Sequence, residues 1–162
     1  MAARSQYQLL DPGDLAPGFR LARLEGGEAA LADLLRTGPI LLAFFKVTCP
    51  VCQLTLPFLE RIHAGAALPI YGISQNDAAD TREFNAEFGI TFPTLLDTEE
   101  SGFPASNGYG ISHVPTMFLI GLDGRITRVI EGWNRQEIES LGESVGVRVV
   151  YPTDDVPAWK SG

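Results

Sequence analysis

The stretch ILLAFFKVTCPVC, residues 40–52, decides the fold class of this 162-residue chain. Its first six residues are all apolar, which is typical of a strand buried on both faces of a sheet. Two cysteines, Cys49 and Cys52, follow directly, and the sequence contains no others. Two cysteines placed at random would stand three residues apart in roughly one chain in eighty, so this spacing itself points to a function.

The residues after the apolar run predict a helix that begins beside Cys49. Pro50 suits the first position of a helix, where its missing N–H costs nothing, and Cys49 is then the capping residue. Its sulfur would accept hydrogen bonds from free backbone N–H groups at the positive end of the helix dipole, which favours the nucleophilic thiolate. Cys52 lies one turn further on, facing inward, where it could resolve a mixed disulfide formed at Cys49. Lys46 could add positive charge nearby.

Outside this stretch, apolar runs alternate with helical segments, which predicts an α/β fold with a mixed central sheet and helices on both faces. The strands are expected at 19–24 (with a hairpin turn at 25–28), 40–45, 68–74, 92–96, 116–120 and 125–131, with an edge strand at 147–151. The helices are expected at 30–36, 49–64, 77–88 and 134–144, with a short helix or loop at 99–109. We expect one domain over 1–162, with a core at about 12–144 and a C-terminal extension at 145–162.

The composition excludes several kinds of partner. Hydrophobic residues make up 45% of the chain and charged residues 20%, which allows a packed core. The net charge of −8 would repel phosphate backbones, so nucleic acid is not an expected partner. The sequence contains no apolar run that could span a bilayer and no secretory signal pattern, so we expect a cytoplasmic protein without membrane contact.

The segment FFKVTCPVC at 44–52 resembles the active site of thioredoxin-fold proteins. Pro57, five residues after Cys52, matches the proline that kinks the active-site helix of that family. The motif SHVPT at 112–116 is similar to its cis-proline loop, in which the bond between Val114 and Pro115 would be cis, face the two sulfurs and offer backbone groups to an extended peptide. The segments APGF at 16–19, LADLL at 31–35 and FPTLLD at 92–97 are similar to the TlpA-like and AhpC-TSA (redoxin) branch.

The resemblance covers about residues 12–142 and implies a thioredoxin-like fold with an N-terminal β-hairpin extension. It also implies a thiol–disulfide oxidoreductase with a role in redox homeostasis and antioxidant defence, acting on protein disulfides or small-molecule thiols with an unidentified electron donor. In a reducing cytoplasm such a pair would act as a reductase. No cofactor or metal is expected. The site residues that the resemblance implies are Cys49 as nucleophile and Cys52 as resolving cysteine, supported by Pro50, Val51, Val114, Pro115, Lys46 and His113.

Three positions depart from the family pattern. Thioredoxins carry an aspartate six residues before the first cysteine, where this chain has Ala43. TlpA-like proteins often carry a glutamate three residues after the second cysteine, where this chain has Thr55. These carboxylates are thought to relay a proton to the resolving cysteine, so the proton path of this chain stays open. Thr48 replaces the usual tryptophan before the first cysteine.

Two other functions compete with the oxidoreductase. A peroxiredoxin-like peroxidase would form a sulfenic acid at Cys49. That family carries a threonine or serine three residues before the cysteine and a proline seven before, and this chain has Lys46 and Leu42 there. A non-catalytic redox sensor or metal-binding module would draw on the cysteines, His63 and His113. His63, however, stands about 16 Å further along the predicted helix, out of reach of the same ion.

Several polar and aromatic residues have a structural interpretation as well as a functional one. His113 could tune Cys49, but we favour a surface position at a strand end, and the same holds for Lys46. We expect Trp133 to pack the last helix. The acidic run of Asp97, Glu99 and Glu100 is expected to be solvated, with a substitute proton relay as the alternative.

Overall fold

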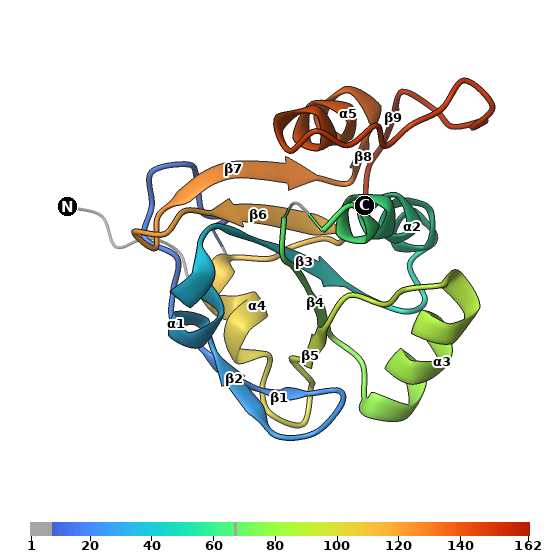
Figure 1. Cartoon of the computed structure of the whole chain (residues 1–162). Coiled ribbons are helices and arrows are strands. Elements are labelled where there is room, and N and C mark those ends of the chain that lie inside the picture. Colours follow the sequence, from blue (N-terminus) through green and yellow to red (C-terminus); the bar gives the residue numbers. More distant parts are fainter. Residues whose placement is uncertain (1–7, 67) are drawn as a thin grey trace.

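The computed structural model describes residues 8–66 and 68–162 and places a seven-stranded sheet between two layers of helices (Figure 1). Residues 1–7 of the expected lead-in lie outside the described residues. Helices α2, α3 and α5 cover one face of the sheet, and α1 and α4 cover the other. The helices are α1 (Leu31–Leu34, continued by a 3-10 turn at Leu35–Thr37), α2 (Pro50–Ala64), α3 (Ala78–Phe88), α4 (Pro104–Tyr109) and α5 (Arg135–Ser144). In the described part of the chain, no helix is both long enough and apolar enough to cross a membrane.

The sheet is mixed, as predicted, and its order is β2-β1-β5-β4-β3-β6-β7. β3, β4 and β5 run parallel, while β6 and β7 extend one side and the β1–β2 hairpin extends the other in antiparallel fashion. Its strands are β1 (Arg20–Arg23), β2 (Glu28–Ala30), β3 (Ile40–Phe45), β4 (Ile70–Ser74), β5 (Thr94–Leu96), β6 (Thr116–Ile120) and β7 (Ile126–Glu131). A second, two-stranded sheet joins β8 (Trp133–Asn134) to β9 (Trp159–Lys160).

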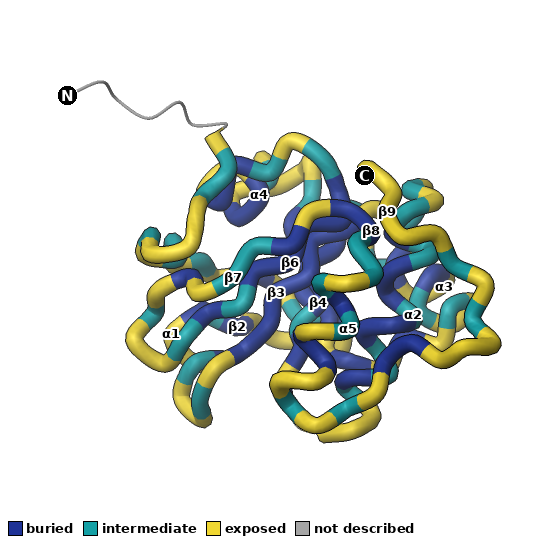
Figure 2. Tube along the Cα trace, turned by 90° about the horizontal axis from the view of Figure 1, so that it is seen from above, coloured by how far each residue is buried: buried dark blue, intermediate teal, exposed yellow. Residues whose placement is uncertain are grey.

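β3 is the centre of the core, and every one of its six residues is buried. Because side chains alternate along a strand, its aromatic residues pack on opposite faces. Phe44 contacts Tyr109 of α4, with ring centroids 5.3 Å apart, and Phe45 contacts Phe84 of α3, with centroids 5.1 Å apart. The tube in Figure 2 is dark blue along β3, β4 and β6, where this buried layer runs. The apolar run read from the sequence is therefore the strand on which both helix layers pack.

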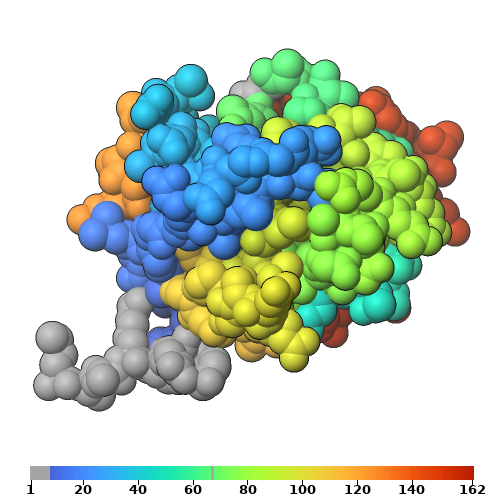
Figure 3. Space-filling model, turned by 90° about the horizontal axis from the view of Figure 1, so that it is seen from below, coloured from blue at the N-terminus to red at the C-terminus, as the bar shows by residue number. Residues whose placement is uncertain are grey.

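The N-terminal hairpin predicted from the alternation at 19–24 forms β1 and β2. It joins the main sheet through β5, since Ala22 and Arg23 pair with Leu96 and Leu95. Arg82 of α3 also donates from Nη2 to the carbonyl of Leu24, at 3.1 Å. In Figure 3 the hairpin, coloured blue, lies beside the green and yellow segments that carry α3, β5 and α4. The hairpin thus extends the sheet at the side away from β7.

The helix boundaries follow the capping residues in the sequence. Asp77 caps α3, because its Oδ1 accepts from the N–H of Asp80 at 2.8 Å. Asn134 caps α5 by accepting from the N–H of Glu137 at 3.1 Å. Gly89 ends α3 at φ +68°, a left-handed conformation that glycine adopts without a Cβ penalty. Each cap satisfies an N–H or carbonyl that the helix itself leaves unpaired.

The edge strand predicted at 147–151 does not form, and that prediction is wrong. The segment packs instead on the α2–α5 layer, where Val149 and Val150 are buried. Gly142 of α5 lets it approach closely, since a Cβ there would clash with the Val149 side chain. The alternation of valines therefore reflects packing against helices, and the strand of the tail is β9, at Trp159–Lys160.

Candidate active site

Cys49 caps α2 as the sequence predicts. The helix begins at Pro50, and the Cys49 backbone is extended, with φ −84° and ψ 115°. Its Sγ accepts from the backbone N–H of Cys52 at 3.3 Å. The side chain is half-buried, and both cysteines are free thiols. The cap therefore holds the first sulfur at the positive end of the helix, where an anion is favoured.

The loop before β6, the strand next to β3, meets the cysteines. The peptide bond between Val114 and Pro115 is cis. The Cys49 thiol donates to the carbonyl oxygen of Val114, with 3.4 Å between sulfur and oxygen. The structure thus brings together Cys49, Cys52, Val114 and Pro115, as the motifs predicted, although Cys49 and Val114 stand 65 positions apart in the chain.

Cys52 differs from Cys49 in its surroundings, because it is fully buried. Burial raises the pKa of the Cys52 thiol well above its ordinary value. A backbone hydrogen bond from Lys46 opposes this rise in pKa, the neighbouring Cys49 adds to it, and the charge of Lys46 opposes it weakly. The accessible sulfur is therefore that of Cys49, and the protected one that of Cys52. This asymmetry suits a pair in which one cysteine attacks and the other resolves.

Two polar side chains that the sequence analysis did not single out hold the loop between β3 and α2. Asn76 accepts through Oδ1 from the backbone N–H of Val47 at 3.0 Å. Gln53 donates from Nε2 to the carbonyl of the same Val47 at 3.1 Å. Asn76 follows β4, the strand next to β3, and Gln53 follows Cys52 directly. The sequence contains no motif that marks either residue, since their role depends on where the strand ends meet.

His113 and Lys46 occupy the surface positions favoured from the sequence. The His113 ring contacts Ser112 Oγ at 3.1 Å through Nδ1 and Glu131 Oε1 at 3.1 Å through Nε2. Both ring nitrogens are therefore engaged beside the end of β7. Lys46 is exposed. A hydrogen bond from its backbone and the charge of its side chain both act to lower the pKa of Cys52.

The residues considered for a metal do not converge. His63 packs edge-on against Phe92, with ring centroids 6.1 Å apart, further along α2 from the cysteines. Within residues 8–66 and 68–162, no group of three or more His, Cys, Asp or Glu side chains could hold a metal ion.

The two positions that carry carboxylates in related proteins are buried here. Ala43 lies in β3 opposite Gly72 and Met117. Thr55 is also fully buried, and its Oγ1 has no hydrogen-bond partner in the part of the chain that the structure describes. Neither side chain can accept a proton at neutral pH.

Asp97 corrects one expectation, because it is fully buried and not part of a solvated run. Its Oδ1 accepts from the N–H of Ala105 at 3.0 Å. Its Oδ2 accepts from the N–H and Oγ of Ser106, at 2.7 and 2.6 Å. The carboxylate therefore anchors the start of α4, where free N–H groups favour an anion. Glu99 and Glu100 are exposed, as expected.

Comparisons with known proteins agree with this geometry. A sequence model described as the AhpC/TSA family matches residues 12–129. Curated relatives named thiol-disulfide oxidoreductase ResA include one from Geobacillus thermodenitrificans, 29% identical over 138 residues that cover 82% of this chain and 77% of the relative. Another, from Bacillus subtilis, is 27% identical over 128 residues that cover 76% of this chain and 69% of the relative.

Solved structures share the fold. The thioredoxin domain of a thiol-disulfide oxidoreductase from Bacteroides vulgatus has a TM-score of 0.74 at 20% identity, and the match covers 85% of this chain and 99% of that one. A peroxidoxin, BcpB from Mycobacterium tuberculosis, has a TM-score of 0.63 at 22% identity, and the match covers 74% of this chain and 84% of that one. At these identities the likeness identifies the thioredoxin-like architecture and does not separate the two chemistries.

Proposed function

Since this chain belongs to the AhpC/TSA family, we propose that it is a thiol–disulfide oxidoreductase in which Cys49 is the nucleophile and Cys52 the resolving cysteine. One observation carries the assignment. The half-buried Cys49 sulfur lies between the N–H of Cys52 and the carbonyl of Val114, one helical turn from a fully buried second thiol. The names of the ResA relatives support the same activity.

The reaction follows from the asymmetry of the pair. The Cys49 thiolate attacks one sulfur of a substrate disulfide, forms a mixed disulfide with it and releases the other sulfur as a thiolate. The Cys52 thiol then loses its proton, and its sulfur attacks Cys49 Sγ. The Cys49–Cys52 disulfide forms, and the second substrate sulfur leaves as a thiol. Two electrons pass from the pair to the substrate, and a dithiol donor must return them.

Resolution requires Cys52 to lose its proton. Burial raises the pKa of its thiol, and neither Ala43 nor Thr55 supplies a carboxylate to take the proton. The groups that oppose the rise come from Lys46, through a backbone hydrogen bond and its charge. We therefore assign Lys46 to the stabilisation of the Cys52 thiolate during resolution.

Reduction is the direction that we propose. The direction depends on the redox potential of the compartment in which the chain acts. A reducing cytoplasm would then keep the pair as a dithiol, with protein disulfides or small disulfides as substrates.

The alternative is a thiol peroxidase with a sulfenic acid at Cys49. The fold allows it, since the peroxidoxin BcpB shares the architecture. The positions three and seven residues before Cys49 hold Lys46 and Leu42, however, so the hydroxyl and the proline that the peroxidase pattern expects there are missing.

Assays on the purified chain and a cysteine variant test the proposal. We expect the wild type to reduce insulin disulfides with dithiothreitol as donor, and Cys49→Ser to lose this rate by roughly a thousandfold or more. Thr48→Ser, a neighbouring change of similar size, should retain it. Full activity in Cys49→Ser would contradict the assignment. Rapid consumption of hydrogen peroxide with sulfenic acid at Cys49, and no insulin reduction, would establish the peroxidase instead.

A further inference from the structure

The segment Pro157–Gly162 lies against the cis-proline loop before β6, which contacts Cys49. After β9, the chain brings Gly162 so close to Val114 that a Cβ at position 162 would clash with the Val114 carbonyl oxygen. That same oxygen accepts the hydrogen bond from the Cys49 thiol at 3.4 Å. One carbonyl therefore contacts both the nucleophile and the segment Pro157–Gly162. In Figure 1 the red end of the chain descends from β9 to the region of α2, at the mark C.

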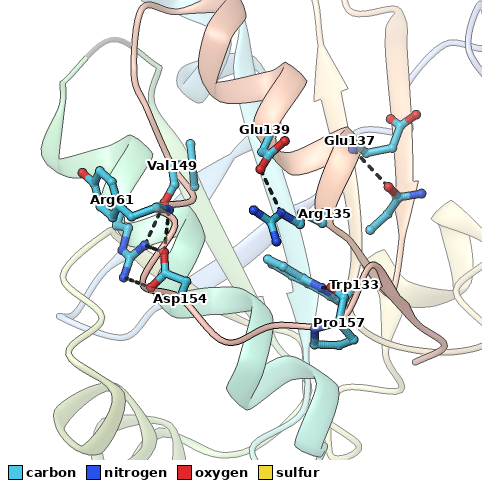
Figure 4. A network of polar contacts seen from close by, with 10 residues as sticks. Arg61, Trp133, Arg135, Glu137, Glu139, Val149, Asp154 and Pro157 are labelled. Atoms are coloured by element: carbon cyan, nitrogen blue, oxygen red, sulfur yellow. Dashed lines mark hydrogen bonds and ion pairs between the residues drawn. The ribbon is translucent and has the colours of Figure 1, made fainter.

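A clamp on α2 fixes the chain that leads into this segment (Figure 4). Arg61 donates from Nη1 and Nη2 to the carboxylate of Asp154, at 2.7 and 3.0 Å. Arg61 Nη1 also donates to the carbonyl of Val149 at 2.8 Å. The guanidinium lies over the rings of Phe58 and Tyr151, at 4.5 and 5.0 Å from their centroids. These contacts hold residues 149–154 on the helix that begins at the active site.

Two further hydrogen bonds guide the segment toward the site. The indole Nε1 of the buried Trp133 donates to the carbonyl of Pro157 at 2.6 Å, as Figure 4 shows. The backbone N–H of Arg135 donates to the carbonyl of Ala158 at 3.0 Å. Beyond these two bonds, β9 pairs antiparallel with β8. These contacts fix the position of the segment relative to β8.

The partner strand β8 is itself attached to the cis-proline loop. The N–H of Gly132, directly before β8, donates to the carbonyl of Pro115 at 2.8 Å. Gly132 has φ +66°, and a Cβ there would clash with the Lys160 carbonyl oxygen. The backbones of Pro115, Gly132 and Lys160 therefore pack closely together, and only glycine fits at position 132.

This placement limits access to the nucleophile. A substrate sulfur must come within about 2 Å of Cys49 Sγ to form a mixed disulfide, and Val114 lies beside that sulfur. In a polypeptide substrate the residues on either side of the sulfur need surface next to Cys49, whereas a small disulfide needs little more than the sulfur itself. Val114 and Pro115 are buried, and Gly162 lies against them.

Residues 159–162 can open more easily than residues 149–157, which the Arg61 clamp and Trp133 hold. Residues 159–162 are all exposed, and Trp159 is 61% exposed. They are held mainly by backbone contacts with few buried apolar atoms, which is typical of parts that open locally. Residues 149–157 keep the Arg61 clamp and the Trp133 hydrogen bond. A hinge near Pro157–Ala158 would free residues 159–162 without unfolding the rest.

We propose that Pro157–Gly162 is a built-in strap over the surface beside Cys49, which must open before a polypeptide disulfide can react. Small disulfides reach Cys49 with the strap closed. This inference rests on the proposed function and deepens it, because a segment of the chain itself then determines the size of the disulfide that can react.

The test compares two substrates and two ways to open the strap. One variant lacks residues 159–162, and the other is the full chain with Gly162→Val, whose side chain would clash with the Val114 carbonyl. We expect kcat/KM for insulin disulfides to rise roughly tenfold in both, as for a strap closed about nine-tenths of the time. The rate with hydroxyethyl disulfide should stay within about twofold, since the strap does not exclude it. Lys160→Ala, which keeps the backbone pairing, is the matched control and should behave as the wild type.

A synthetic peptide with the sequence PAWKSG (157–162) should lower the insulin rate of the shortened variant in proportion to its concentration. An unchanged insulin rate in both variants, or an equal rise with both substrates, would overturn the strap. Failure of the full chain to reduce hydroxyethyl disulfide would instead overturn the proposed function, and the strap with it.

Discussion

The loop that carries the cysteines and the tail after α5 are built on contacts of different reach. Around the cysteines, Cys49 Sγ accepts from an N–H three positions away and Gln53 donates to a carbonyl six positions away. In the tail, the Arg61–Asp154 pair joins residues 93 positions apart. The loop thus combines local contacts with contacts to Val114 and Asn76 far along the chain, whereas the tail is positioned mainly by distant helices.

We expect the two regions to affect different properties of the protein: the loop its reaction rate, and the tail its stability and substrate access. The cysteines sit at the start of a helix that is packed along its whole buried face, so we expect exchanges of loop residues to change rates more than stability. In the tail, Gly162 lies beside Val114, which in turn contacts Cys49. We therefore expect substitutions in the tail to change stability or substrate access.

The largest stability effect should come from Trp133, which joins the tail to α2. Its side chain is fully buried, its ring lies 4.8 Å from that of Phe58, and its Nε1 holds Pro157. Trp133→Ala should lower the free energy of unfolding by about 3–5 kcal/mol, measured by urea denaturation. The matched change at the exposed Trp159, Trp159→Ala, should cost no more than roughly 0.5 kcal/mol. Equal losses at the two positions would mean that the tail is not anchored through Trp133.

The Arg61–Asp154 pair should make the attachment of the tail sensitive to acid. The hydrogen bonds from Arg61, followed by the one from the backbone N–H of Tyr151, lower the pKa of Asp154 from 3.8 to about 2. As the pH falls below about 4, the unfolded chain binds this proton first, so the stability from the pair is present above that range and is lost down to about pH 2. Thermal unfolding curves over this range should therefore move less in Asp154→Asn than in the wild type.

The exposed neighbour Asp155 supplies the matched control for this pH effect. Asp155→Asn should keep the acid response of the wild type, because the ion pair with Arg61 involves Asp154. An identical response in Asp154→Asn and the wild type would show that the pair does not contribute to stability.

A smaller effect, a gain in stability, is expected from a substitution on α2 close to the cysteines. The hydroxyl of Thr55 is buried without a partner among the described residues, and an unsatisfied buried polar group costs free energy. Thr55→Val should therefore raise the free energy of unfolding by about 1 kcal/mol and leave the rate of disulfide reduction unchanged.

Thr81 provides the contrast to Thr55. It is equally buried, but its hydroxyl forms a hydrogen bond of 2.7 Å with Ser74 Oγ. Thr81→Val should lower the free energy of unfolding by about 1–2 kcal/mol, since it leaves the Ser74 hydroxyl without this partner. A slower resolution step in Thr55→Val would mean that the Thr55 hydroxyl takes part in the reaction.

Much of the fold could be predicted from the sequence because its signals are local. The apolar run at 40–45 gave the bounds of β3, and Asp77 and Asn134 marked the starts of α3 and α5. The site was predictable for the same reason, since Cys49, Cys52 and the Val114–Pro115 bond each belong to a short motif. The only long-range step, the meeting of the two motifs, came from the family resemblance.

The rest depended on contacts that no short segment encodes. The valines at 147–150 alternate like a strand but pack on helices, because Gly142 of α5 lets this segment approach closely. Asp97 stands in an acidic run like a surface residue, yet it is buried because the start of α4 presents its N–H groups there. Asn76 reaches Val47 only because β3 and β4 end side by side.

The central claim is that Cys49 attacks and Cys52 resolves, and trapping the intermediate tests it most directly. Cys52→Ser should form a mixed disulfide with a substrate protein that mass spectrometry maps to Cys49 and that dithiothreitol releases. The double change Cys49→Ser with Cys52→Ser should trap nothing. No adduct on Cys52→Ser, together with a stable adduct mapped to Cys52 in Cys49→Ser, would contradict the assignment.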